Sequence, residues 1–195
     1  MNRKAMTQPK TIREQIAGLV TAITPLDELE RTHQAEVLEW VHSGANLFRT
    51  AKPDKPAKHL VSYFVLYDPS TKTVLLADHI NAGLWLPTGG HVEVNEHPQT
   101  TVIRECKEEL KTQAKFAQNT PLFITATQTV NTDRPHTDVS LWYVLKGQKG
   151  MSLDWDKREF KTVKWWDIDA IKQGHTQSFD PHMRRFVEKL EVLAV

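Results

Sequence analysis

The apolar residues of this chain change their spacing once, near residue 58, from a helical period to the alternation of β-strands. Before that point, five of them recur at helical spacing: Ile12, Ile16, Leu19, Val20 and Ile23. Beyond it, three residues alternate with their neighbours as in a strand: Leu60, Phe64 and Leu66. The two periods predict helices followed by a sheet. Because the later strands and helices are joined by connections of varied length, we expect an α+β fold and not a doubly wound sheet.

The first 50 residues are predicted to form a helical hairpin. The first helix starts near Thr11 and stops at Thr24-Pro25. The second is expected to begin there, with Thr24 as its N-cap, Pro25 in the first helical position, and carboxylates from Asp27 and Glu28 in the first turn. A hairpin of about 35 residues is too small to bury both of its apolar stripes. It therefore packs on the remaining chain or on a second copy, and we keep a homodimer as a hypothesis beside a simple docking role.

A segment with two prolines and four charges, residues 51–58, predicts an extended and solvated linker. We place a boundary here, between an N-terminal helical extension (1–50) and a second domain (51–195). The strands predicted beyond it are 60–66, 73–77, 122–127, 139–145 and 160–166. The helices predicted beyond it are 98–110, 167–172 and 181–190. The first two strands are expected to pair as a hairpin through a turn at 68–71.

The composition excludes several classes of protein. Lys and Arg number 25 against 24 Asp and Glu, so the basic excess typical of proteins that bind long nucleic acid is missing. Cys106 is the only cysteine, which excludes an intrachain disulfide and favours a reducing compartment. No stretch approaches the roughly 20 apolar residues of a membrane span. Arg13 and Glu14 interrupt the one apolar run that resembles a signal peptide, so we expect a cytoplasmic protein.

Glutamates gather on one face of the helix predicted at 98–110. Glu105, Glu108 and Glu109 stand at i, i+3 and i+4, so their carboxylates project from one face. Each like-charged pair costs roughly 0.2–0.5 kcal/mol on an exposed helix. Arg104 can neutralise one carboxylate, either Glu96 or Glu105. The others suit a hard divalent cation such as Mg²⁺, which is bound by one or two carboxylates together with substrate phosphates. A solvated acidic face is the alternative.

The spacing around these glutamates is far more specific than the glutamates alone. Gly90 is followed by five residues, Glu96, seven residues, Arg104-Glu105, two residues and Glu108-Glu109. With residue usage of roughly 5–7% per type, a chance match is on the order of one in a million. The segment resembles the Nudix box, and the match runs from Gly90 to Thr112. A tight glycine turn at Gly89-Gly90 is expected to precede it.

The resemblance implies a Nudix hydrolase: an α/β/α sandwich around a mixed sheet that cleaves a nucleoside diphosphate linked to another moiety, such as a nucleoside triphosphate or a nucleotide sugar. It implies Mg²⁺ as cofactor, with Mn²⁺ as a substitute, and attack on phosphorus by a metal-activated water. By position, the metal ligands would be the side chains of Glu105, Glu108 and Glu109, with a backbone carbonyl of Gly89 or Gly90.

Other roles follow from the same resemblance. Arg104 and Glu96 would be the pair that holds the box in shape. Glu159 is preferred over Asp154 and Asp156 as a carboxylate from outside the box, because it lies just before a predicted strand. The general base is either Glu105 or Glu159.

Two residues depart from the box pattern. Lys111 replaces a glycine that would end the helix in the left-handed conformation, and Thr112 replaces an apolar residue. Because that conformation costs a lysine roughly 1 kcal/mol more than glycine, we expect the helix to run longer or to end differently. Cys106 occupies an apolar box position and is interpreted as a core residue.

The substrate's identity is not encoded in the box. Aromatic side chains that could stack on a base, or that simply belong to the core, are Trp85, Trp142, Tyr143 and Trp155. Arg134 and His136 could contact phosphate or lie in a solvated loop. The nine histidines show no close pair with metal-ligand spacing, and only His91 lies near the box.

Three alternatives to a hydrolase remain. A Nudix-fold module that binds nucleotides without cleaving them usually lacks some box glutamates, whereas all are present here. An isopentenyl diphosphate isomerase needs a cysteine on a distant strand, and the sole cysteine, Cys106, lies in the box helix. A structural domain with an acidic helix would not bind Mg²⁺.

Overall fold

The computed structural model describes residues 10–51, 55–129, 135–174 and 179–192. Within them, the chain begins with two helices, α1 (Ile12–Thr21) and α2 (Glu28–His42). α1 starts with a capping box, in which the Thr11 side chain and the Glu14 side chain each accept a backbone N–H of the other residue. The hairpin predicted for this segment is therefore present in the structure.

The start of the second helix was predicted three residues too early. Thr24 and Pro25 lie outside any helix, and Asp27 is the N-cap residue. Its side chain accepts the backbone N–H of Glu30 at 2.8 Å and also pairs with Arg185. A contact with the far end of the chain thus helps to fix the helix start, and local capping rules cannot see such a contact.

Seven strands in the described part of the chain form one mixed sheet. They are β1 (Lys58–Asp68), β2 (Thr73–His79), β3 (Leu84–Leu86), β4 (Thr88–His91), β5 (Phe123–Gln128), β6 (Thr137–Lys146) and β7 (Phe160–Asp167). The order is β3-β2-β1-β6-β5, with β4 also paired to β1 and β7 to β2. β1 and β6 run parallel, and the other pairs are antiparallel. The predicted hairpin of the first two strands is confirmed.

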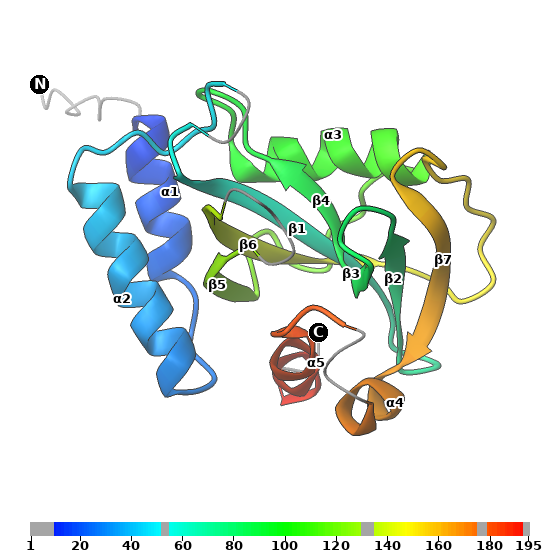
Figure 1. Ribbon diagram of the computed structural model, residues 1–195. Helices are drawn as coiled ribbons and strands as arrows, with labels where there is room; N and C mark the ends of the chain where they lie inside the picture. The colour runs from blue at the N-terminus through cyan, green and yellow to red at the C-terminus, as the bar shows by residue number, and fades with distance from the viewer. Residues whose placement is uncertain (1–9, 52–54, 130–134, 175–178, 193–195) are drawn as a thin grey trace, which may run out of the picture.

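Helices cover both faces of the sheet. Figure 1 shows α3 (Pro98–Leu110) on one side, and α4 (Ile168–Gln173) and α5 (Met183–Val192) on the other. Alternate side chains of β1 pack on the two faces of the sheet, because successive side chains of a strand point to opposite sides. Phe64 packs in the core beneath α3, whereas Val65 packs with α4 and α5. The α+β sandwich expected from the sequence is confirmed.

The apolar stripes of α1 and α2 are buried within this chain. Ile16, Val20, Val37 and Val41 belong to the same core cluster as the apolar residues of α3. At the other end of the hairpin, Glu30 pairs with α5. The segment therefore packs on the sheet of its own chain, while the domain division at residue 50 and the homodimer stay predictions.

Backbone hydrogen bonds join residues at the start of the segment that was predicted as an extended linker. The Lys55 N–H donates to the Ala51 carbonyl at 3.0 Å, and the Thr50 N–H donates to the Lys55 carbonyl at 2.8 Å. The prediction of an extended path was wrong between Ala51 and Lys55, because the first of these hydrogen bonds holds the two residues together and an extended chain would keep them apart. Among the described residues, no helix has the length and apolar character needed to cross a membrane.

Gly89 and Gly90 lie in β4, not in the tight turn predicted for them. Gly89 pairs with Tyr63 and Gly90 with Ser62 of β1. At Gly89, φ is 138°, and a Cβ there would lie 2.1 Å from the Ser62 carbonyl oxygen. The glycine is thus required by close packing of two strands, which a turn signal does not distinguish from a turn.

Candidate active site

A cavity of about 810 Å³ opens between the end of α3 that carries the glutamates and the strands beneath it. Its walls include residues of α3 and of the strands β1 to β7, together with Glu159 and Asp180. The four glutamates singled out as ligands or bases all line it: Glu105, Glu108, Glu109 and Glu159. Gly89, Gly90, Arg104 and the histidines His91 and His136 line the same cavity. The structure thus brings the predicted box residues and Glu159 to one place.

Glu109 is the most deeply placed of these carboxylates. The residue is only 5% exposed, and its Oε2 accepts the Gly89 backbone N–H at 2.8 Å. Burial raises the pKa of Glu109 well above its usual range, and the neighbouring charges of Glu105 and Glu159 raise it further. A buried carboxylate with these neighbours favours a cation beside it.

Glu105 is held between the same cavity and Arg104. Its Oε1 accepts a hydrogen bond from Arg104 Nη1 at 2.6 Å. Burial raises the pKa of Glu105, and the Arg104 charge offsets only part of that shift. The guanidinium therefore fixes the position of this carboxylate without cancelling the negative charge of the cavity.

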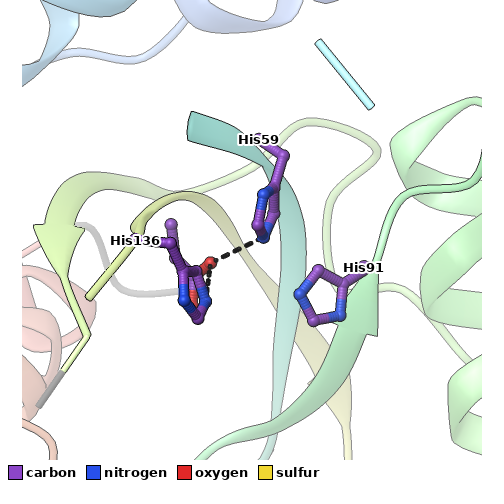
Figure 2. Close-up of side chains that lie close together, drawn as sticks. His59, His91 and His136 are labelled. Atoms are coloured by element: carbon purple, nitrogen blue, oxygen red, sulfur yellow. Dashed lines mark ion pairs between the residues drawn. The ribbon is translucent and has the colours of Figure 1, made fainter. Parts of the chain in front are cut away.

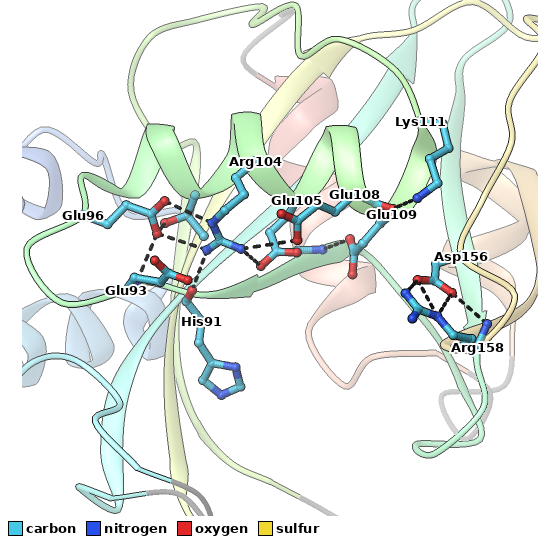
Figure 3. A network of polar contacts seen from close by, with 12 residues as sticks. His91, Glu93, Glu96, Arg104, Glu105, Glu108, Glu109, Lys111, Asp156 and Arg158 are labelled. Atoms are coloured by element: carbon cyan, nitrogen blue, oxygen red, sulfur yellow. Dashed lines mark hydrogen bonds and ion pairs between the residues drawn. The ribbon is translucent and has the colours of Figure 1, made fainter.

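The pair predicted to hold the box in shape is present. Arg104 Nε and Nη2 donate to the two oxygens of Glu96 at 3.2 and 3.1 Å, and Nη2 also reaches the His91 carbonyl (Figure 3). Glu96 in turn accepts the Thr101 hydroxyl at 2.7 Å. These bonds tie the loop before α3 to the helix face that carries the glutamates. The sequence left two possible partners for Arg104, and in the structure it bonds both Glu96 and Glu105.

The remaining carboxylates differ in their surroundings. The Glu108 side chain is 61% exposed and lies 3.8 Å from Arg104 Nη1. Glu159 faces the cavity, and its charge acts on both Glu105 and Glu109. Asp156 instead forms an ion pair with Arg158, and together with Asp154 it lines a separate shallow depression. This geometry favours Glu159 over the two aspartates.

The donor set fits a hard divalent cation. All the acidic side chains facing the cavity offer oxygen, the ligand that Mg²⁺ and Mn²⁺ prefer. Burial raises the pKa values of Glu105 and Glu109, and the charges of neighbouring carboxylates raise them further. Among the described residues, however, Glu105, Glu108 and Glu109 do not form a group of side chains close enough together to hold one metal ion. These three carboxylates thus converge less tightly than their helical spacing predicted.

α3 ends at the position where the box pattern has a glycine. Lys111 itself adopts the left-handed conformation, with φ 51° and ψ 30°, and its Nζ donates to the Glu108 carbonyl at 2.6 Å. The expectation that the helix would run longer or end differently was wrong. Packing of Cys106 and Leu110 into the core fixes the helix end despite the cost to lysine.

This strain predicts that Lys111→Gly is more stable than Lys111→Ala by about 1 kcal/mol. Both variants lose the Nζ hydrogen bond, so their difference isolates the backbone conformation. Urea denaturation of the two variants measures it. Equal stabilities, or a more stable alanine variant, would contradict the assignment of strain at Lys111.

The structure contains a group of potential metal-binding side chains that the sequence pattern did not indicate. His59, His91, His136 and Asp138 bring their donor atoms within 4.8 Å of one another. The prediction that the histidines form no close pair holds only for spacing along the chain, because these residues come from β1, β4, β6 and the position just before β6. The parallel register that pairs His59 with Asp138 would have revealed the contact, and sequence spacing alone does not give that register.

The aromatic candidates for base stacking belong mainly to the core. Trp142 and Tyr143 are fully buried. Trp85 packs against Trp166 with ring centroids 5.1 Å apart, and Trp155 lines the separate depression beside Asp156. Arg134 lies outside the described residues. The core interpretation therefore holds for Trp142 and Tyr143.

Asp180 adds a titratable group to the cavity wall that the sequence did not indicate. It accepts the His182 backbone N–H at 2.8 Å, and burial raises its pKa from 3.8 to about 6. Between these two values the folded chain binds more protons at this group than the unfolded chain does. Its contribution to stability is therefore present below pH 3.8 and lost as the pH rises through about 6.

Asp180→Asn is expected to remove this dependence, because asparagine keeps the acceptor and does not ionise. The free energy of unfolding of the native chain minus that of the variant should fall between about pH 4 and about pH 7. Urea denaturation at several pH values measures the difference. A difference that stays constant or rises with pH would refute the raised pKa.

Solved structures with this architecture share the fold at low sequence identity. A NUDIX-family hydrolase from Clostridium perfringens is 23% identical, with a TM-score of 0.53 over 69% of this chain and 97% of that one. The E. coli dihydroneopterin triphosphate pyrophosphohydrolase is 16% identical, with a TM-score of 0.55 over 76% and 99%. The MutT protein of Methanosarcina mazei Go1 is 17% identical, with a TM-score of 0.55 over 70% and 95%. No curated protein sequence matches the chain significantly.

The fold and the cavity define an α/β/α protein with an acidic helix over a mixed sheet. The NUDIX domain family model matches residues 57–190, which is well over half of the chain. The chain belongs to the Nudix family, and it is an enzyme of the class that acts on phosphorus-containing anhydrides.

Proposed function

We propose that this enzyme is a Mg²⁺-dependent pyrophosphohydrolase whose substrate is a nucleoside diphosphate linked to another group. The observation that carries the proposal is a pair of carboxylates, the buried Glu109 and the Glu105 side chain, which is 14% exposed, in a cavity that Glu159 also lines. A divalent cation, when bound, lowers the pKa of water and neutralises charge on phosphoryl oxygens. Mn²⁺ is the expected substitute.

The chain's own residues would position this chemistry. Glu105, Glu108 and Glu109 would hold the cation, with a carbonyl of Gly89 or Gly90 as a backbone ligand. Arg104 fixes the Glu105 carboxylate, and Glu96 fixes Arg104 from its other side. Either Glu105 or Glu159 would take the proton from the attacking water, since both face the cavity.

The names of two proteins with similar structures agree with cleavage of a diphosphate bridge. One is a dihydroneopterin triphosphate pyrophosphohydrolase, and another is an Ap4A hydrolase from C. elegans, 16% identical with a TM-score of 0.50 over 70% of this chain and 98% of that one. Identities this low support the fold and leave the substrate open. The cavity of about 810 Å³ has room for a nucleotide.

A substrate panel tests the proposal. Nucleoside triphosphates, oxidised nucleotides, nucleotide sugars, ADP-ribose and dinucleoside polyphosphates are each incubated with Mg²⁺ and with Mn²⁺, and the products are separated by chromatography. We expect cleavage of a diphosphate bridge in at least one of them and none after chelation. Tight binding of a nucleotide without cleavage would instead indicate a non-catalytic module.

The close approach of β4 to Glu105 gives a sharper test of the site. A Cβ at Gly90 would lie 2.2 Å from Glu105 Oε1, so Gly90→Ala displaces this carboxylate. We expect turnover to fall by about 10- to 100-fold, because an error of about 1 Å in position can cost that much. Gly18→Ala, whose Cβ meets nothing within 4 Å, is the matched control. Unchanged turnover in folded Gly90→Ala would contradict the role of Glu105.

A further inference from the structure

Three imidazoles and one carboxylate form a group beside the cavity, and three of the four residues line it: His91, His136 and Asp138. His59 lies on β1, His91 ends β4, His136 precedes β6, and Asp138 lies on β6. Figure 2 shows the three labelled rings gathered around one space, with ion pairs drawn to the carboxylate. Their donor atoms all lie within 4.8 Å of one another.

Two of the distances match the edges of a coordination tetrahedron. His59 Nε2 lies 3.2 Å from Asp138 Oδ1, and His136 Nε2 lies 3.4 Å from the same oxygen. Ligands bound tetrahedrally at about 2.0–2.1 Å from a metal ion are ~3.3 Å apart. Asp138 Oδ1 therefore lies at the spacing of a fellow ligand from each of the two nitrogens.

Hydrogen bonds outside the cluster orient two of the rings. His59 Nδ1 lies 2.8 Å from the Pro56 carbonyl, which can only accept, so this nitrogen carries the proton. His136 Nδ1 lies 3.3 Å from Thr129 Oγ1, a hydroxyl that can donate to this nitrogen or accept from it. In neutral His59 the Nε2 lone pair then faces Asp138. Metal-bound histidines typically have their other nitrogen fixed in this way.

Among the described residues, two facing atoms of the cluster have no hydrogen-bond partner. His59 is fully buried, and neither its Nε2 nor Asp138 Oδ1 makes a hydrogen bond of acceptable geometry. Two acceptors facing each other in a buried site are unfavourable unless a positive charge lies between them. That charge is either a metal ion or a proton on the ring.

We propose that His59, His91, His136 and Asp138 form a binding site for a divalent transition metal, with Zn²⁺ as the preferred ion, separate from the carboxylate site on α3. Nitrogen-rich donor sets select Zn²⁺ and its neighbours, whereas Mg²⁺ requires oxygen ligands. Three histidines and one aspartate complete the four ligands of a tetrahedral zinc site. The ion would tie β1, β4 and β6 together beside the catalytic cavity.

Cobalt spectroscopy and metal analysis test this site. The full chain, without a polyhistidine tag, is treated with a chelator, dialysed against Zn²⁺ or Co²⁺, and assayed for bound metal. We expect one bound ion per chain and the visible absorption bands of tetrahedral Co²⁺. The Glu105→Gln/Glu109→Gln double variant should keep both signals, so this test stands apart from that of the proposed hydrolase.

Variants of the cluster should lose the ion while folding normally. Asp138→Asn and His136→Ala are expected to weaken Zn²⁺ binding at least 10-fold, and His79→Ala, a cavity histidine outside the cluster, should bind as the native chain does. Native-like binding by both cluster variants would overturn the proposal. So would an absence of binding by the native chain, together with nitrogen NMR shifts showing His59 protonated on both nitrogens at neutral pH.

Discussion

Replacing Glu30 by alanine is expected to lower the free energy of unfolding by about 3–5 kcal/mol. Glu30 is fully buried, and its Oε1 accepts a hydrogen bond from Lys189 Nζ at 2.6 Å. The same side chain accepts the backbone N–H groups of Leu26 and Ile124. The variant leaves the Lys189 ammonium buried without its partner, and this is the main cost. Urea denaturation of native and variant chains measures the loss.

Two controls separate the buried pair from ordinary helix effects. Glu28→Ala removes a glutamate of the same helix whose side chain is 85% exposed, and it should cost under about 1 kcal/mol. Glu30→Gln combined with Lys189→Met should cost less than the sum of its single changes, since neither charge is then left alone. A loss below about 1 kcal/mol in Glu30→Ala would show that the pair does not fasten α2 to α5.

Glu105→Gln and Glu109→Gln should each reduce turnover by at least about 100-fold, the low end of the cost of losing a general acid or base. Glutamine keeps the size of the side chain and removes the charge that would hold the cation. The fold should survive, since burial of these carboxylates raises their pKa values and so disfavours their charged forms. Steady-state rates with the substrate found in the panel measure the effect.

Glu36→Gln, an exposed change on α2, is the control for this pair and should leave turnover unchanged. Circular dichroism of all three variants establishes that they are folded. Near-normal rates in both Glu105→Gln and Glu109→Gln would rule out the assignment of these residues to catalysis.

The box helix was predicted correctly because its information is local. Apolar spacing gave 98–110 as a helix, and the structure has α3 at Pro98–Leu110. The contacts of Arg104 with Glu96 and Glu105 also follow from residues near one another in the chain. Short-range periodicity and spacing were therefore sufficient for this half of the cavity.

The other half of the cavity depends on strand pairing, which the sequence does not supply. The histidine cluster forms because β1 and β6 run parallel with His59 opposite Asp138. Gly89 and Gly90 looked like a turn because glycine serves both turns and closely packed strands. The buried Glu30–Lys189 pair joins residues 159 positions apart, and no local pattern marks it.

The central claim is that the acidic face of α3 holds a divalent cation inside the cavity. Anomalous diffraction from crystals of the full chain grown with Mn²⁺ tests it most directly. We predict a strong anomalous peak beside the carboxylates of Glu105 and Glu109, which disappears in the Glu105→Gln/Glu109→Gln variant. A cavity with no peak beside these glutamates, or with one only at the histidine cluster, would contradict the claim.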